Sequence, residues 1–406
     1  MDIDNALIGR RVRELRSWRT MNLSALAGLA GMSVSYLSMI ERGERPVTKR
    51  ATLEALARAL QVSPTDLTGK PWEQSTDQAE GQAHASLVAI AAAMDAYELG
   101  DDSGEQAREW PQVAADVRRL VEAQQIRADY AEMGGLIPQL LSELHTLYVR
   151  DPVHRREILL ALVRCYSSAV WMAKLGRQDG LTLMAAMAAQ RCSEELGSPQ
   201  WRGYTTWLRG VTTGSLNRAK QYQRATAMAD ELAPGLNNPE ITQAYGQLHL
   251  SAALAAAAQA DRDTAATHLD EAAAVADRLD HEVGTFAQVW FGRTNVRIWR
   301  VTIGVELGDG PALAEIARDV HVDAIPSPAR QAVFHATYGR ALLAESRTRD
   351  EGLAEILRAE HLAPQHIRGD VFVRESVADE LRRARRDAGG RELRGLAWRM
   401  GVAPTG

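Results

Sequence analysis

The stretch from Asn22 to Gly43 constrains the fold most, because it predicts two short helices joined by a tight turn. Asn22 and Ser33 each stand where a helix would begin, and their side-chain oxygens can accept hydrogen bonds from free backbone N–H groups of the opening turn. Gly31 stands where a left-handed residue would end the first helix. Such short helices are marginal alone. The chain must therefore pack further helices around this pair and present one of the two outward.

Apolar residues at helical spacing supply those further helices on both sides of the pair. The spacing of Leu7, Val12 and Leu15 predicts a helix over residues 6–18. A fourth helix is expected to begin after Thr48, and the Ser63-Pro64-Thr65-Asp66 run predicts the start of a fifth. We therefore expect a five-helix domain over residues 1–69.

These residues resemble the helix-turn-helix of the Cro/phage-repressor family, also called the Xre family. The resemblance spans residues 8–67 and includes the runs Ile8-Gly9, Leu26-Ala27, Ala30-Gly31-Met32-Ser33, Tyr36-Leu37-Ser38, Ile40-Glu41-Arg42-Gly43 and Ala59-Leu60-Gln61-Val62-Ser63. So many matches at fixed offsets form a specific signal. The resemblance implies that the second helix of the pair lies in the DNA major groove.

The helix that would enter the groove carries few base-reading side chains. The residues expected to face the bases are Ser33, Val34, Ser35, Tyr36, Ser38 and Met39, and none of them is Arg, Gln or Asn. Since those absent types make the bidentate contacts to guanine and adenine, we expect more shape readout and phosphate binding than usual. For Val34, a core position and a groove contact are both open.

Basic residues gather in the head. Residues 1–70 hold 11 Lys and Arg against 7 Asp and Glu, whereas the whole chain has a net charge of −5. The rest of the chain is therefore acidic, and ordinary solubility alone could account for that charge. The residues expected to contact DNA phosphates are Arg11, Arg13, Asn22, Arg42, Arg45, Lys49 and Arg50. For Arg11 and Arg13 a solvated face is the alternative. The resemblance implies that Arg16 instead pairs with Glu41 as a structural ion pair.

Polar residues with Pro and Gly over residues 70–82 predict a linker that lets the head move. From residue 83 onward the pattern is helical throughout, with predicted breaks at Gly134-Gly135 and at other Gly and Pro clusters. Short connections favour antiparallel helix pairs. We expect a helical domain over 83–390, with a helix over 284–306, and a tail over 391–406.

Three segments of the body resemble one another and predict a repeat. They end at Leu196, Leu232 and Leu279. Residues 350–364 resemble the second half of a tetratricopeptide repeat, whose usual period is 34 residues. The fold class is therefore all-α, with the helix-turn-helix domain followed by an α-solenoid of tetratricopeptide-like helix pairs. An irregular helical domain is the alternative.

A solenoid has a concave face that can bind a ligand. Aromatic residues make up only 5% of the chain, which makes those of the body conspicuous. The residues predicted for a ligand groove are Trp207, Tyr245, Trp290, Arg293, Arg297 and Trp299, with the two arginines receiving an acidic group. Each aromatic residue could instead lie in the core.

The sequence carries no Gly-rich phosphate loop, no nucleophile motif and no metal-spaced cluster. We therefore expect no enzyme activity, no cofactor and no metal site. Cys165 and Cys192 are expected to be reduced core residues. No apolar stretch with a cleavage site follows the N-terminus, and the longest apolar tract, residues 250–258, is too short for a membrane span. These features favour a cytoplasmic protein.

Together these features predict a DNA-binding transcription regulator that acts as a homodimer. The architecture resembles repeat-bearing Xre regulators of high-GC bacteria and, more loosely, pheromone-sensing regulators whose repeats bind a peptide. The body would then sense a peptide or small molecule, which predicts a closed, aromatic-lined pocket. The alternative is an adaptor whose repeats dock a partner protein on an open apolar groove.

Overall fold

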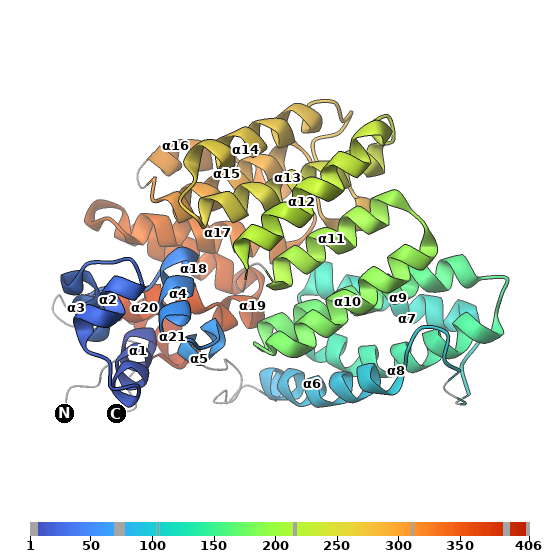
Figure 1. Cartoon of the computed structure of the whole chain (residues 1–406), viewed down its shortest axis with the longest axis horizontal. Helices are drawn as coiled ribbons and strands as arrows, with labels where there is room; N and C mark the ends of the chain where they lie inside the picture. Colours follow the sequence, from blue (N-terminus) through green and yellow to red (C-terminus); the bar gives the residue numbers. More distant parts are fainter. Residues whose placement is uncertain are drawn as a thin grey trace.

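The fold is all-helical, as the sequence predicts. The structure, a computed structural model, describes residues 7–68, 78–102, 104, 106–213, 217–309, 312–384 and 390–402. Within these ranges it contains helices and no strand. Figure 1 shows the head, in blue, beside the C-terminal helices in red, while the rest of the body extends away from the head.

Five helices form the head. They are α1 (Leu7–Trp18), α2 (Leu23–Leu29), α3 (Val34–Glu41), α4 (Arg50–Ala59) and α5 (Pro64–Thr68). Their apolar faces meet in one small core, which includes Ile8, Val12, Leu26, Leu37, Ile40, Leu56 and Leu60, each 0% exposed. The spacing of these residues at every third or fourth position is what one helix face requires.

The body is a succession of helices joined by short connections. It comprises α6 (Gln78–Ala96), α7 (Trp110–Glu122), η1 (Ala123–Arg127), α8 (Tyr130–Arg150), α9 (Arg155–Leu175), α10 (Asp179–Leu196), α11 (Pro199–Thr213), α12 (Arg218–Leu232), η2 (Ala233–Gly235), α13 (Pro239–Ala257), α14 (Arg262–Ala276), η3 (Phe286–Gln288), α15 (Arg293–Leu307), α16 (Ala312–Arg318), η4 (Val322–Ala324), α17 (Pro328–Leu343), η5 (Ser346–Thr348), α18 (Arg349–Leu362), α19 (Pro364–Gly369), α20 (Val371–Ala384) and α21 (Arg391–Arg399). Most neighbours along the chain pack on each other, as in a helical-repeat body.

Small residues set the spacing of some helix pairs. On α17 and α18, a Cβ added to Gly339 would lie 2.8 Å from the carbonyl oxygen of Gly352, and one added to Gly352 would lie 2.9 Å from that of Gly339. Because real Cβ atoms do not approach so closely, any side chain here would push the two helices apart.

The body curls until its early and late parts touch. The backbone N–H of Tyr130 on α8 donates to Gln365 Oε1 at 3.0 Å, and the Tyr130 hydroxyl lies 2.7 Å from His366 Nδ1. Trp290 Nε1 donates to Gln125 Oε1 at 3.3 Å. These contacts join segments more than 150 residues apart and bring the early and late parts of the body together.

The head packs directly on the C-terminal helices of the body. Phe372 of α20 belongs to the head's own apolar core. The backbone N–H of Ile8 donates to Glu375 Oε1 at 3.0 Å, and Arg340 donates to the carbonyl oxygen of Thr48. The head therefore has a defined position on the body in this arrangement, although a linker was expected to let it move.

Several predicted boundaries differ from the observed ones. No break occurs at Gly134-Gly135, since α8 runs through both glycines and Pro138. A Cβ on Gly134 would lie 2.5 Å from the Ser86 side chain, so this glycine allows α6 and α8 to approach closely. Residues 70–77 of the predicted linker lie outside the described residues, and α6 begins inside the predicted linker, at Gln78.

Two further predictions, the helix over 284–306 and the tail over 391–406, are wrong. The helix expected over 284–306 begins only at Arg293, because Ala287, Gln288 and Trp290 adopt left-handed backbone conformations. The segment 391–406 is not simply a tail. It contains α21, which buries Leu393, Leu396 and Ala397 against the body, while residues 403–406 lie outside the described residues.

Candidate DNA-binding face and ligand cavity

The two central helices of the head meet at a capped turn. Asn22 Oδ1 accepts from the backbone N–H of Ala25 at 2.7 Å, and Ser33 Oγ accepts from that of Tyr36 at 3.1 Å. Gly31 has φ +66°, which a residue with a side chain adopts rarely. Helices α2 and α3 are bent by 110° relative to each other. This angle lies within the range of about 90–120° of helix-turn-helix motifs.

Helix α3 buries one side and exposes the other. Leu37 and Ile40 are fully buried in the head core. Of the residues predicted to face the bases, Ser33, Val34 and Ser35 are exposed and Tyr36, Ser38 and Met39 are half-buried. Val34 is 45% exposed, so it lies on the outer face and not in the core. Base contact by these side chains stays a prediction.

Arg16 and Glu41 join the first helix to the end of the third. Arg16 Nε donates to Glu41 Oε1 at 2.6 Å and Nη2 donates to Oε2 at 2.9 Å, while Nη1 donates to the carbonyl oxygen of Met21 at 2.8 Å. The hydrogen bonds to Glu41 raise the pKa of Arg16 above its ordinary value. Arg16 and Glu41 thus form an ion pair, and its contribution to the stability of the head stays a prediction.

Five residues predicted to contact phosphates are exposed on the head. They are Arg11, Arg13, Asn22, Arg42 and Arg45. Arg42 is held beside the end of α3 by Glu44, at 2.7 and 2.8 Å, and by the hydroxyl of Ser38. Arg45 lies in the same loop. Arg42 and Arg45 therefore flank the outer face of α3, where the backbone of a bound duplex would run.

The prediction that Arg50 contacts phosphate is wrong for this arrangement, and Lys49 also turns toward the body. The guanidinium of Arg50 pairs with Glu306, whose other oxygen accepts from the Arg50 backbone N–H at 3.0 Å. A Cβ on Gly308 would lie 2.5 Å from Lys49 Nζ, which puts this ammonium at the C-terminal end of α15. The negative end of the helix dipole stabilises a cation there.

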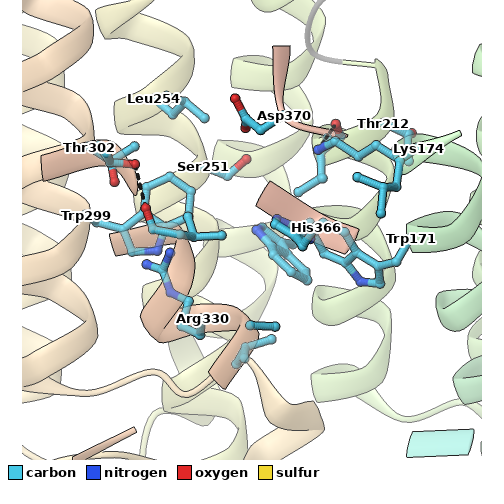
Figure 2. Close-up of a pocket in the computed structure, with 18 of the residues that line it drawn as sticks. Trp171, Lys174, Thr212, Ser251, Leu254, Trp299, Thr302, Arg330, His366 and Asp370 are labelled. Atoms are coloured by element: carbon cyan, nitrogen blue, oxygen red, sulfur yellow. Dashed lines mark hydrogen bonds between the residues drawn. The ribbon is translucent and has the colours of Figure 1, made fainter. Parts of the chain in front are cut away.

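A cavity of about 480 Å³ lies between the head and the inner face of the body. Its walls come from α4 and α5 of the head, from α9, α11, α13, α15 and α17, and from the segment that joins α19 to α20. Figure 2 shows Trp299 and Arg330 on one side of this space and Trp171 and Lys174 on the other. Its volume falls in the range of about 300–1,000 Å³ of small-molecule sites.

A buried ion pair forms the part of the cavity wall where head and body meet. Arg218 at the start of α12 donates to Glu54 of α4 from Nε at 3.1 Å and from Nη2. The two side chains are only 9% and 6% exposed. Arg218 Nη1 also donates to Gln221 at 2.8 Å. An occupant of the cavity would therefore lie beside a charged contact that holds the head.

The comparisons with known proteins concern mainly the head. Residues 7–68 match the family described as a helix-turn-helix domain. The head is a helix-turn-helix domain. The HTH-type transcriptional repressor RghR of Bacillus subtilis (strain 168) is 41% identical to this chain over 54 residues. The match covers 13% of this chain and 40% of the repressor, so it spans less than half of that relative.

Two solved structures are similar along most of the chain at low identity. One is PlcR of Bacillus thuringiensis in complex with the peptide PapR7 and DNA, with a TM-score of 0.38 and 11% identity over 90% of this chain and 99% of the other. The second is ComR of S. thermophilus in complex with DNA and its signalling peptide ComS. Its TM-score is 0.26, with 14% identity over 87% of this chain and 99% of the other.

Three of the six residues predicted for a ligand groove line the cavity of this helix-turn-helix protein. They are Trp207, Trp290 and Trp299. The other three do not. The Tyr245 hydroxyl donates to Glu271 at 2.9 Å, and Arg293 Nε donates to Glu282 at 2.7 Å, with Arg297 Nη1 at 3.9 Å from the same carboxylate. The two arginines therefore already have an acidic partner outside the cavity.

The sequence analysis did not predict the two cations that line the cavity, Lys174 and Arg330. The sequence does contain a pattern that could have identified them. Neither has an acidic residue three or four positions away, so neither can form the usual ion pair along its own helix. Lys174 also follows a long apolar run and is one of only four lysines in a chain with 47 basic residues.

The cysteines and the longest apolar helix belong to the core of the body. Cys165 and Cys192 are buried and form no disulfide, and burial raises the pKa of both thiols. Among the described helices, α9 is long and apolar enough to cross a membrane, but 72% of its apolar window is buried inside the protein. The bent pair α2 and α3 passes the same test only when taken together.

Proposed function

We propose that this protein is a DNA-binding transcription regulator whose helix α3 enters the major groove. The exposed outer face of α3, next to the capped turn and flanked by Arg42 and Arg45, carries this proposal. The similarity of the head to part of a transcriptional repressor supports it. Contact with two half-sites roughly 34 Å apart would require a dimer, which is part of the proposal.

The body is proposed to sense a ligand in the cavity. Leu53 and Glu54 of the head line the same space as residues of α9, α13 and α17. A ligand would therefore contact head and body together. It can shift the equilibrium between docked and undocked heads only by binding the two arrangements with different affinity. The cavity wall is suited to this because the docked head completes it.

The adaptor hypothesis receives less support from the geometry. It requires an open apolar groove, whereas the contacts of Tyr130 and Trp290 join distant segments across the inner face of the body. An aromatic-lined cavity is typical of a small-ligand site. The ligand-sensing regulator is therefore the function that the described residues support best.

The test is a genome-wide map of DNA contacts in cells. We would compare the wild type with a variant in which Arg13, Arg42 and Arg45 are replaced by Ala. The matched control replaces three arginines of the body surface, Arg202, Arg297 and Arg300. We expect a few sharp peaks in the wild type and the control that disappear in the head variant. Peaks that survive in the head variant, or a diffuse signal in all three proteins, would contradict the proposal.

A further inference from the structure

Cationic side chains outnumber carboxylates in the wall of the cavity. The cations are Arg50, Lys174, Arg177, Arg218 and Arg330, and the carboxylates are Glu54 and Asp370. Two of the cations are already neutralised, because Arg218 pairs with Glu54 and Arg50 pairs with Glu306. Asp370 uses one oxygen to accept two backbone N–H groups at the start of α20. The cavity therefore keeps an excess of positive charge.

Arg330 has no carboxylate partner among the described residues. Its Nε and Nη2 both donate to the amide oxygen of Asn295, at 3.0 and 2.7 Å. The guanidinium lies over the ring of Trp299, 5.6 Å from its centre. Burial lowers the pKa of Arg330 to about 10, so the group stays charged at neutral pH. Asn295 and Trp299 fix this guanidinium while Nη1 remains available to an anion.

Lys174 is a second cation of the wall without a carboxylate within ion-pair distance in the described part of the chain. Its ammonium donates to the carbonyl oxygen of Val211 at 3.3 Å and lies 5.2 Å from the ring centre of Trp171. Burial, followed by the charges of Arg50 and Arg218, lowers its pKa to about 7. By surface area Lys174 is an exposed residue, and it lines the cavity. A nearby anion would favour its protonated form.

Broad aromatic surfaces complete the wall. The rings of Trp171 and Trp299 offer apolar surface on opposite sides of the cavity, and Trp207 lines the cavity with them.

From these observations we infer that the cavity binds a small organic acid, with its carboxylate on Arg330 and an apolar, preferably aromatic, body among the tryptophans. Arg330 Nη1 can donate a charge-assisted hydrogen bond to a carboxylate oxygen. Lys174 adds charge from the opposite side of the space. This inference rests on the proposed ligand-sensing function and specifies the ligand class for it.

The test uses two fluorescent probes with the same rings. Anilinonaphthalene sulfonate carries an anionic group, and N-phenyl-1-naphthylamine lacks it. Binding of each to the full-length protein is measured by fluorescence titration for the wild type and for Arg330→Gln, Arg330→Lys, Lys174→Gln and Arg297→Gln. Arg297 is a matched control, because it is an exposed arginine of the body outside the cavity.

We expect Arg330→Gln to weaken binding of the anionic probe about tenfold, or about 1.4 kcal/mol of binding free energy, because it removes a hydrogen bond to a charged group. Lys174→Gln should cause a smaller loss, and Arg297→Gln none. Binding of the neutral probe should stay unchanged, which would show that the cavity is intact. If Arg330→Gln loses binding of both probes, the Arg330→Lys variant tests whether the positive charge at this position matters. It keeps that charge and should bind the anionic probe more tightly than Arg330→Gln does.

Equal binding of the two probes by the wild type, or anionic-probe binding that is insensitive to Arg330→Gln and Lys174→Gln, would overturn the inference. Displacement of the bound anionic probe then identifies the source of the carboxylate. Displacement by 4-phenylbutyrate assigns a free organic acid, and displacement only by acetyl-Leu-Phe assigns a peptide C-terminus. Displacement by neither overturns the carboxylate assignment. DNA binding is measured separately, so failure here leaves the regulator proposal standing.

Discussion

Glu54 of the head and Arg218 of the body form a bidentate ion pair at the edge of the cavity, and both side chains are almost fully buried. The pair joins α4, which follows α3, to α12, in the middle of the body. A charge pair withdrawn from water in this way is stable only while both partners are present. It therefore couples the position of the head to the cavity wall.

Replacing Glu54 by Gln should weaken docking of the head. The change leaves Arg218 buried without its carboxylate, and breaking a buried pair from one side costs about 3–5 kcal/mol. Hydrogen exchange of the α4 and α5 amides should become faster, while that of α13 amides stays slow. Glu14→Gln is the control, because Glu14 pairs only with exposed arginines on its own helix. Unchanged exchange in the Glu54 variant would show that the pair does not hold the head.

Replacing Arg16 by Ala should destabilise the head more than it changes base preference. Glu41 is 6% exposed on its side chain, so loss of the guanidinium leaves a buried carboxylate and removes about 3 kcal/mol of stability. Thermal unfolding measures the loss, and binding to a panel of duplexes measures preference. A wild-type melting temperature in the variant would rule out the structural role of this pair.

Replacing Arg45 by Ala should weaken binding to all DNA sequences. The slope of log K against log salt concentration should decrease in magnitude by about 1, as expected for one lost phosphate contact. Arg50→Ala is the contrasting variant. Because Arg50 is occupied by Glu306, its loss should leave the salt slope unchanged and instead weaken head docking. A salt slope that changes for Arg50 and not for Arg45 would reverse the two assignments.

Docking of the head should depend on pH through Glu375. This carboxyl accepts from the Ile8 backbone N–H, and burial raises its pKa to about 7. The hydrogen bond from Ile8, followed by the charges of Arg382 and Arg374, opposes the shift, and Asp379 adds to it. A carboxyl whose pKa is raised binds its proton more tightly in the folded protein. Its contribution to stability is therefore complete below its ordinary pKa of 4.5 and is lost as the pH rises to about 7.

Denaturation with urea between pH 4.5 and 7.5 measures this contribution. The slope attributable to Glu375 is at most about 1.4 kcal/mol per pH unit. Glu375→Gln keeps an oxygen for the Ile8 N–H and should remove that part of the pH dependence. Glu392→Gln changes an exposed carboxyl of α21 and serves as the control. If wild type and Glu375→Gln show the same pH profile, the head–body contact does not titrate.

The structure of the head was more predictable from the sequence than that of the body. Its caps, its turn glycine and its apolar spacing are local features, and each depends on residues within one or two helical turns. The sequence left the position of Val34 undecided between core and surface, and the structure exposes it while burying Leu37 and Ile40 of the same helix. The body was less predictable, as its glycines show. Gly134 lies inside a helix because α6 must approach there, and such a packing reason has no local sequence signature.

The sequence by itself determined the all-helical class and the helix-turn-helix head, since helix periodicity and capping act over a few residues. Tertiary structure alone decided that Arg50 turns from DNA to Glu306, that Trp207, Trp290 and Trp299 meet around one cavity, and that Arg330 and Lys174 face into it. These choices join residues far apart in the chain. The partner that neutralises a charge, or the absence of one, depends on how distant helices pack.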